Sequence, residues 1–128
     1  MEKTDAIRVT GGSGTVGARL VDVMQDDGYS NLLVPTQQDM GLCDSRSVGS
    51  WFEEHRPRFA FLIAAKVGGF AANVANRTGF LANNLRIAVN QLSACHNFGV
   101  EKLLLLGSSC IDIRAYPQPM HEDHLPRC

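Results

Sequence analysis

A glycine-rich turn near the N-terminus constrains this chain more than any other feature. The apolar run of residues 6–10, AIRVT, is followed by glycines at Gly11, Gly14 and Gly17, and an amphipathic helix pattern begins at once. A turn with glycines at this spacing, between a strand and a helix, lets the backbone approach a pyrophosphate closely. It also aims the N-terminus of the helix at the negative charge. The turn therefore predicts dinucleotide binding; the alternative is a glycine-rich connection without a ligand.

Composition excludes several classes of function. The 128 residues carry a net charge of −1, so no broad basic face favours nucleic acid or an anionic membrane. No apolar run approaches the roughly 20 residues of a membrane-spanning helix, and the N-terminus lacks the apolar segment of a secretory signal. We therefore expect a cytoplasmic protein. No His/Cys cluster has zinc spacing, so no metal site is expected, and free thiols are expected at Cys43, Cys95, Cys110 and Cys128.

The apolar pattern predicts four strands that alternate with three helices. The strands are expected at residues 6–10, 31–34, 59–65 and 102–107, and the helices at 14–27, 44–55 and 78–98. The runs FAFLIAA and LLLL are apolar without alternation, which is typical of parallel strands covered on both faces. The sequence thus predicts an α/β fold, a Rossmann-type doubly wound parallel sheet with the spatial order 3-2-1-4. The fourth strand is expected to be an edge that exposes leucines, as in the first half of a larger fold.

Two polar positions follow the fourth predicted strand. Ligands of such sheets bind beyond the carboxyl ends of the strands, at a switch point expected between the first and fourth strands. Ser108 is therefore placed to donate a hydrogen bond to a carbonyl oxygen that gains negative charge; the alternative is a polar residue at a strand end. Cys110 is either a positioned thiol or a small buried residue.

The end of the second predicted strand bears on the choice of cofactor. A site for NAD usually shows an acid there, for the ribose hydroxyls, whereas a site for NADP shows Arg or Lys. Residues 34–39 read VPTQQD, in which Asp39 comes late and no residue is basic. These residues leave NAD and NADP both open.

Two further residues are expected close to the site. Lys66, in the loop that follows the third predicted strand, either contacts phosphate or is solvated. Asn84 shares an apolar stripe of the long helix with Phe80, Leu81 and Ala88, so we expect it to point inward. A buried amide needs hydrogen-bond partners, which makes Asn84 a structural link or a brace for backbone near the site.

Several motifs together resemble the GDP-L-fucose synthase family of extended short-chain dehydrogenases/reductases. They are GGSGTVG at residues 11–17, AAKVGG at 64–69, Asn73, NNLRIAVN at 83–90, LLLLGSSCI at 103–111 and QPMHEDHLP at 118–126. The pair AAKVGG and LGSSCI is specific within the superfamily. The resemblance covers nearly the whole chain but less than half of a typical family member.

The resemblance implies an enzyme that epimerises GDP-4-keto-6-deoxy-D-mannose and reduces it with NADPH to GDP-L-fucose. Ser108 would be the catalytic serine, and Cys110 would be the thiol for proton transfer. The residues implied in NADP binding are Gly11, Gly12, Ser13, Gly14, Thr15, Val16, Gly17, Gln37, Leu42, Ala64, Leu106, Gly107 and Ser109. Family members are typically homodimers, and their usual dimer helices lie beyond this stretch of sequence.

The chain departs from the family pattern in three places. The YxxxK motif that supplies the family's tyrosine and lysine is absent, because neither Tyr29 nor Tyr116 has a lysine four residues on. The family's basic residues near the adenosine phosphate are replaced by Ser13, Pro35 and Gln37. The family's GSSCIYP reads GSSCIDI.

These departures predict that residues 1–128 form a single truncated NAD(P)-binding domain without the substrate domain, inactive by itself. Two alternatives stay open. One is a dinucleotide-binding module without catalysis, and the other is a related nucleotide-sugar epimerase or dehydratase.

Overall fold

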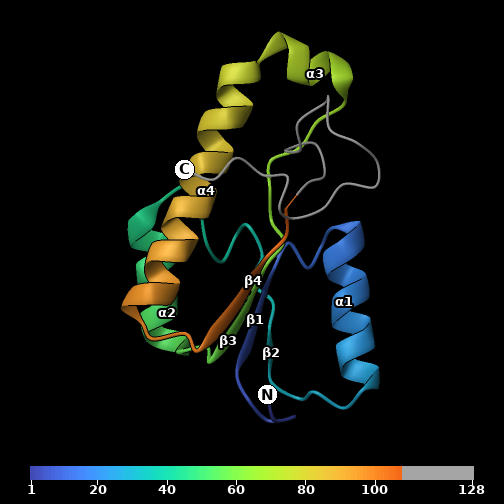
Figure 1. Ribbon diagram of the computed structural model, residues 1–128, viewed down its shortest axis with the longest axis vertical. Coiled ribbons are helices and arrows are strands. Elements are labelled where there is room, and N and C mark those ends of the chain that lie inside the picture. The colour runs from blue at the N-terminus through green and yellow to red at the C-terminus, as the bar shows by residue number, and fades with distance from the viewer. Residues whose placement is uncertain (108–128) are drawn as a thin grey trace, which may run out of the picture.

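Residues 1–107, which the computed structural model describes, fold into a parallel sheet with helices on both faces (Figure 1). The elements in chain order are β1 (Ile7–Thr10), α1 (Thr15–Asp26), β2 (Leu32–Leu33), α2 (Ser45–His55), β3 (Phe59–Leu62), α3 (Phe70–Ala75), α4 (Arg77–Asn97) and β4 (Lys102–Leu105). The predicted α/β class and the predicted strands and long helices are confirmed. The short helix α3 was not predicted; it lies in the expected loop.

The order of the strands corrects the prediction. The sheet reads β2-β1-β3-β4, with every neighbouring pair parallel, and not 3-2-1-4. The reason lies in the strands themselves: β3 is apolar on both faces and needs a central place beside β1, whereas β2 has two half-buried residues and suits an edge. The chain therefore crosses back over β1 after β2. The switch point consequently lies between β1 and β3.

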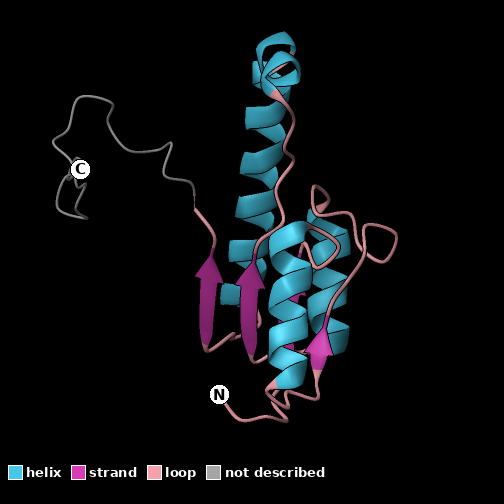
Figure 2. Ribbon diagram, turned by 90° about the vertical axis from the view of Figure 1, so that its right-hand side faces the viewer, coloured by secondary structure: helices cyan, strands magenta, loops and turns pink. Residues whose placement is uncertain are grey.

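The reversal after β2 also decides which helix covers which face. Right-handed crossovers in opposite directions put α1 on one face of the sheet and both α2 and α4 on the other, as Figures 1 and 2 show. Alternate residues of β1 point to opposite faces of the sheet. Ile7 and Val9 join the core beneath α1, while Arg8 lies against Trp51 and Phe52 of α2.

The ends of the helices follow local capping chemistry. The carboxylate of Asp44 accepts a hydrogen bond of 3.0 Å from the backbone N–H of Arg46 at the start of α2. The side chain of Asn76 accepts one of 3.0 Å from the N–H of Gly79 at the start of α4. Gly14 caps α1 without any side chain, so the first N–H groups of α1 keep no side-chain partner.

Apolar surface remains exposed on α4 and on the edge strand. The buried residues of α4 are Ile87, Gln91, Ala94 and Cys95, so the buried face differs from the expected stripe, in which Leu81 is exposed and Phe80 and Ala88 are half-buried. Leu81 is 62% exposed and Leu85 is 55% exposed. Every residue of β4 is exposed as well, as expected for an edge.

The cysteines that the structure describes, Cys43 and Cys95, are free thiols, the first exposed and the second buried. Cys110 and Cys128 lie outside the described residues. Within residues 1–107, no helix combines the length and apolarity that crossing a membrane requires.

Candidate dinucleotide-binding site

The glycine turn brings β1, α1 and the end of β3 into contact at distances that exclude larger side chains. Gly11 has a φ of +77°, and a Cβ on it would lie 3.0 Å from the backbone nitrogen of Ala64. A Cβ on Gly17 would lie 2.1 Å from the carbonyl oxygen of Gly11. Two of the glycines are therefore required by the turn itself, which closes through a hydrogen bond of 2.9 Å from the N–H of Gly14 to that same oxygen.

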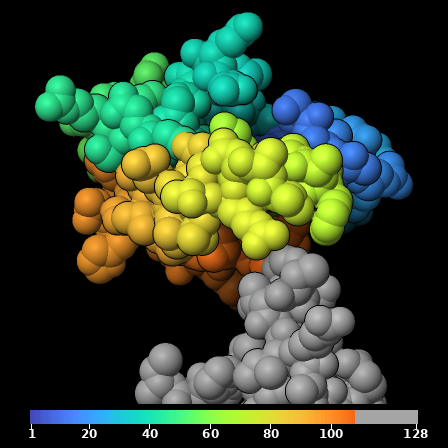
Figure 3. Space-filling view, turned by 90° about the horizontal axis from the view of Figure 1, so that it is seen from above, coloured from blue at the N-terminus to red at the C-terminus, as the bar shows by residue number. Residues whose placement is uncertain are grey.

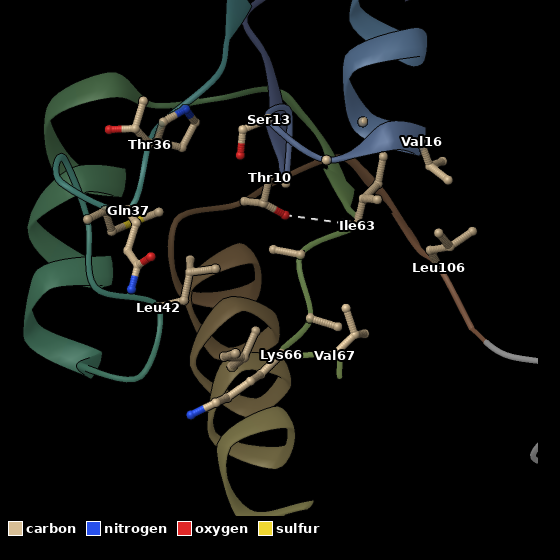
Figure 4. Close-up of a pocket in the computed structure, with 18 of the residues that line it drawn as sticks. Thr10, Ser13, Val16, Thr36, Gln37, Leu42, Ile63, Lys66, Val67 and Leu106 are labelled. Atoms are coloured by element: carbon tan, nitrogen blue, oxygen red, sulfur yellow. Dashed lines mark hydrogen bonds between the residues drawn. The ribbon is translucent and has the colours of Figure 1, made fainter. Parts of the chain in front are cut away.

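A cavity of about 730 Å³ opens above this turn, at the carboxyl ends of β1 and β3 (Figure 4). Most of its lining comes from the turn with the start of α1, the segment after β2 and the segment after β3, and residues of α4 and Leu106 complete it. Figure 3 shows the same face of the molecule, with the start of α1 in blue, the segment after β2 in teal and the start of α4 in yellow. The position is the switch point of the sheet, where ligands of such folds bind.

Most of the predicted cofactor residues that the structure describes line this cavity. They are Gly11, Ser13, Gly14, Thr15, Val16, Gly17, Gln37, Leu42, Ala64 and Leu106. Gly12 and Gly107 are not in the lining. Gly12 instead faces Val34, whose Cγ1 would lie 2.2 Å from a Cβ at that position. Ser108, Ser109 and Cys110 lie outside the described residues, so their roles stay predictions.

Part of the lining was not predicted from the sequence, because the switch point was expected between the first and fourth strands. The missed residues include Ile63 and Ala65 after β3, Met40 and Cys43 after β2, and Asn83 and Ile87 on α4. The sequence contains one partial signal, because Pro35 ends the second strand early and so favours an edge position for it. The structure shows this strand at the edge and β3 paired with β1.

Hydrogen bonds from two side chains fix the backbone beneath and beside the cavity. The hydroxyl of Thr10 donates to the carbonyl oxygen of Phe61 over 3.3 Å and accepts from the N–H of Ile63 over 3.2 Å, which joins the ends of β1 and β3. Figure 4 shows the second bond as a dashed line. On α4, the amide of Asn84 bonds both backbone groups of Lys66, which confirms the predicted brace.

The charges around the cavity are few. Lys66 is the one charged residue in the lining that residues 1–107 supply. Beside the end of β2, the hydroxyl and the N–H of Thr36 hold the pKa of Asp39 below its ordinary value. No group of His, Cys, Asp and Glu among residues 1–107 has the arrangement of a metal site.

Known proteins resemble this chain over its whole length. Residues 7–126 match the model of the NAD dependent epimerase/dehydratase family. The putative GDP-L-fucose synthase 2 of Arabidopsis thaliana is 40% identical over 125 residues, which is 98% of this chain and 38% of that protein. The chain thus spans less than two fifths of the length of this relative.

Two solved structures share the fold and contain the same cofactor. A GDP-mannoheptose C4 reductase from Campylobacter jejuni with NADP bound is 34% identical, with a TM-score of 0.92 over 98% of this chain and 37% of that one. A GDP-L-fucose synthetase from Naegleria fowleri bound to NADP is 28% identical, with a TM-score of 0.82 over 98% and 37%. With the glycine cradle, the parallel sheet and a family match over 7–126, this chain belongs to the NAD dependent epimerase/dehydratase family.

Proposed function

We propose that this chain is the dinucleotide-binding part of an enzyme that epimerises and reduces a GDP-linked 4-keto sugar. The observation that carries the proposal is the cavity at the switch point, lined by a turn in which Gly11 and Gly17 leave no room for side chains. A turn of this kind lets backbone N–H groups reach a pyrophosphate, and the start of α1 adds its positive dipole end. NADP(H), the cofactor of the two solved relatives, fits this cradle.

Each side of the cavity binds a different part of the cofactor. Backbone groups of residues 11–17 hold the pyrophosphate, and Gln37 and Leu42 border the adenosine. Ala64 and Leu106 border the nicotinamide side. The bound cofactor would supply the hydride that reduces the keto group. The proposed roles of Ser108 and Cys110 are a hydrogen bond to the keto oxygen and proton transfer during epimerisation.

GDP-4-keto-6-deoxy-D-mannose is the proposed substrate, as the resemblance to GDP-L-fucose synthases implies. The relatives include a synthase and a reductase named for GDP-heptoses, so a GDP-keto-heptose is the second substrate to assay. We propose that residues 1–128 do not turn over either sugar alone, because the chain contains no YxxxK motif. NADPH-dependent turnover by the purified 128-residue chain would contradict this last proposal. It would also reject the alternative of a binding module without catalysis.

A charge placed at the N-cap of α1 tests cofactor binding. Gly14 has extended backbone angles, φ −86° and ψ 165°, which Asp and Asn both adopt at an N-cap. Gly14→Asp should retain the fold, since its carboxylate caps the helix, and it should weaken NADPH binding at least about tenfold by occupying and repelling the pyrophosphate position. Gly14→Asn is the matched neutral control. Binding is measured by calorimetric titration, and the fold by circular dichroism. Equal affinity of the Asp and Asn variants, or no saturable binding by the folded parent chain, would reject the proposal.

A further inference from the structure

The end of the cavity beside β2 decides which dinucleotide is accepted, because the adenosine ribose lies at that end in sheets of this type. We propose that this site does not select for a phosphate on the ribose 2′-hydroxyl, so that NAD(H) binds at least as tightly as NADP(H). The inference rests on the proposed function, namely that the cavity binds a dinucleotide.

Uncharged residues form the lining at the ribose end. Among residues 1–107, Ser13, Pro35, Thr36 and Gln37 border it, and none is cationic. Lys66 does line the cavity, but Figure 4 shows it on the far side from Ser13 and Thr36, and its Nζ lies 6.0 Å from the ring centroid of Phe80. A phosphate dianion gains most from Arg or Lys through charge-assisted hydrogen bonds. The described residues at the ribose end offer none of these.

Thr36 also has its hydrogen-bond donors engaged. Its backbone N–H and its hydroxyl each donate to Oδ2 of Asp39 over 2.7 Å. The N–H of Asp39 in turn lies 3.4 Å from the Thr36 hydroxyl oxygen, a reciprocal pairing like that of a capping box. The donors of Thr36 are thus committed to a carboxylate and are not free for a phosphate.

The turn formed by residues 36–39 also places a negative charge at the ribose end of the cavity. Asp39 follows β2 by several residues in sequence, yet its carboxylate returns to Thr36 at the strand's end. The Thr36 donors lower the pKa of Asp39, so the carboxylate is ionised at neutral pH. Asp39, Glu54 and His55 line a second hollow of about 450 Å³ that shares Pro35 with the cavity. Like charges repel, so the Asp39 carboxylate, which is hydrogen-bonded to Thr36 at the ribose end, opposes a 2′-phosphate.

Matched ligands and variants test the inference. The chain is titrated with NADH and NADPH, and with 5′-AMP and adenosine 2′,5′-bisphosphate, which report on the adenosine end alone. We expect NADH to bind at least as tightly as NADPH, and the two nucleotides to rank the same way. Gln37→Arg should tighten NADPH about tenfold relative to NADH, because it introduces a cation at the ribose end. Asp39→Asn should tighten NADPH about threefold by removing the charge. Glu53→Gln removes the same charge from an exposed residue of α2 outside both hollows and should change neither affinity.

The outcomes separate this inference from the proposed function. Tighter binding of NADPH than NADH by about tenfold would overturn the inference and leave the proposed function intact. An unchanged NADPH affinity in Gln37→Arg, folded by circular dichroism, would also overturn it, because the ribose would then not lie at Gln37. Saturable binding of neither dinucleotide would overturn both proposals.

Discussion

The side-chain amide of Asn84 pairs with both polar backbone groups of Lys66. The N–H of Lys66 donates to Oδ1 of Asn84 over 2.7 Å, and Nδ2 of Asn84 donates to the Lys66 carbonyl oxygen over 2.9 Å. The two residues lie 18 apart in sequence, one after β3 and the other on α4. This pair therefore ties the lining of the cavity to a helix that packs against the sheet.

Removal of the Asn84 amide should loosen the segment after β3. Asn84→Ala loses two hydrogen bonds, which predicts a fall of about 1–2 kcal/mol in the free energy of unfolding. The Lys66 amide should also exchange faster with solvent, and both effects are measurable by urea titration and hydrogen exchange. Asn83→Ala removes the neighbouring amide, for which no bond to Lys66 is observed, and should leave Lys66 exchange unchanged. Equal exchange rates in the two variants would contradict the prediction.

The glycines of the turn should differ sharply in their tolerance of a methyl group. A Cβ on Gly17 would lie 2.1 Å from the Gly11 carbonyl oxygen, whereas one on Gly14 would lie 3.3 Å from it. Gly17→Ala should therefore lower the free energy of unfolding by at least about 2 kcal/mol, because backbone atoms must move. Gly14→Ala should cost about 1 kcal/mol or less. Thermal unfolding of the two variants side by side measures the contrast, and equal losses would be inconsistent with this turn geometry.

The buried charge of Arg8 should cost stability. Arg8 is 0% exposed, its guanidinium carbon lies 4.5 Å from the Phe52 ring centroid, and its Nε and Nη1 have no partner in the structure. Burial lowers the pKa of Arg8 to about 10, so Arg8 stays charged at neutral pH but its charge is less favourable in the folded chain than in the unfolded chain, and the full cost is present at every pH below about 10. Arg8→Met keeps an apolar chain against the ring and removes the charge. It should raise the free energy of unfolding by about 1–2 kcal/mol.

A lysine at the same position supplies the comparison. Arg8→Lys keeps a charge but loses the planar stacking on Phe52, and it should be less stable than the parent chain. Urea titrations compare the three proteins. A methionine variant that unfolds at lower urea than the parent would show that the stacking outweighs the cost of burying the charge.

The acid stability of the chain should depend on Asp5. Arg58 lies between Asp5 and Glu101 and donates to both carboxylates, which links the segments that precede β1, β3 and β4. The backbone N–H of Glu2 and then Arg58 hold the pKa of Asp5 below its ordinary value of 3.8. A carboxylate with a depressed pKa stabilises the fold above its ordinary value and loses that contribution as the pH falls through the folded value. Unfolding measured below pH 3.8 should therefore depend less on pH in Asp5→Asn than in the parent chain.

The exposed edge strand should promote association. Leu104 is 49% exposed on β4, which has open backbone groups along one side. Light scattering should show concentration-dependent growth for the 128-residue chain, and Leu104→Lys should suppress it. Val23→Lys removes an apolar residue that is 41% exposed on α1 and should not suppress growth. Equal behaviour of the two variants would place the association elsewhere.

The sequence predicted the parts of the fold that depend on neighbouring residues. The pattern predicted helices that begin near residues 14 and 44, and the structure has α1 from Thr15 and α2 from Ser45. It failed for α3, because six residues among glycines and asparagines contain too little periodicity. It also placed Leu81 in a stripe expected to face inward, although the face of the helix that packs on the sheet is the one with Ile87.

Asp39 shows why part of the site could not be predicted. Its place five residues after Val34 predicts a position too late in the sequence for the end of β2. The backbone after Pro35 turns back on itself, with a hydrogen bond of 3.2 Å from the N–H of Met40 to the carbonyl oxygen of Thr36. This turn returns the Asp39 carboxylate to the strand's end. Position along the chain was therefore a poor guide to position in space.

The glycine turn, the class of the fold and the family motifs could be predicted from the sequence alone, because each depends on short-range geometry or on residues in series. The strand order, and with it the meeting of Gly11 and Ala64 at the switch point, was established by the folded chain. Strands compete for a central position, and the outcome depends on how much apolar surface each strand buries against helices distant in sequence. The early stop at Pro35 is only a partial sign of that outcome.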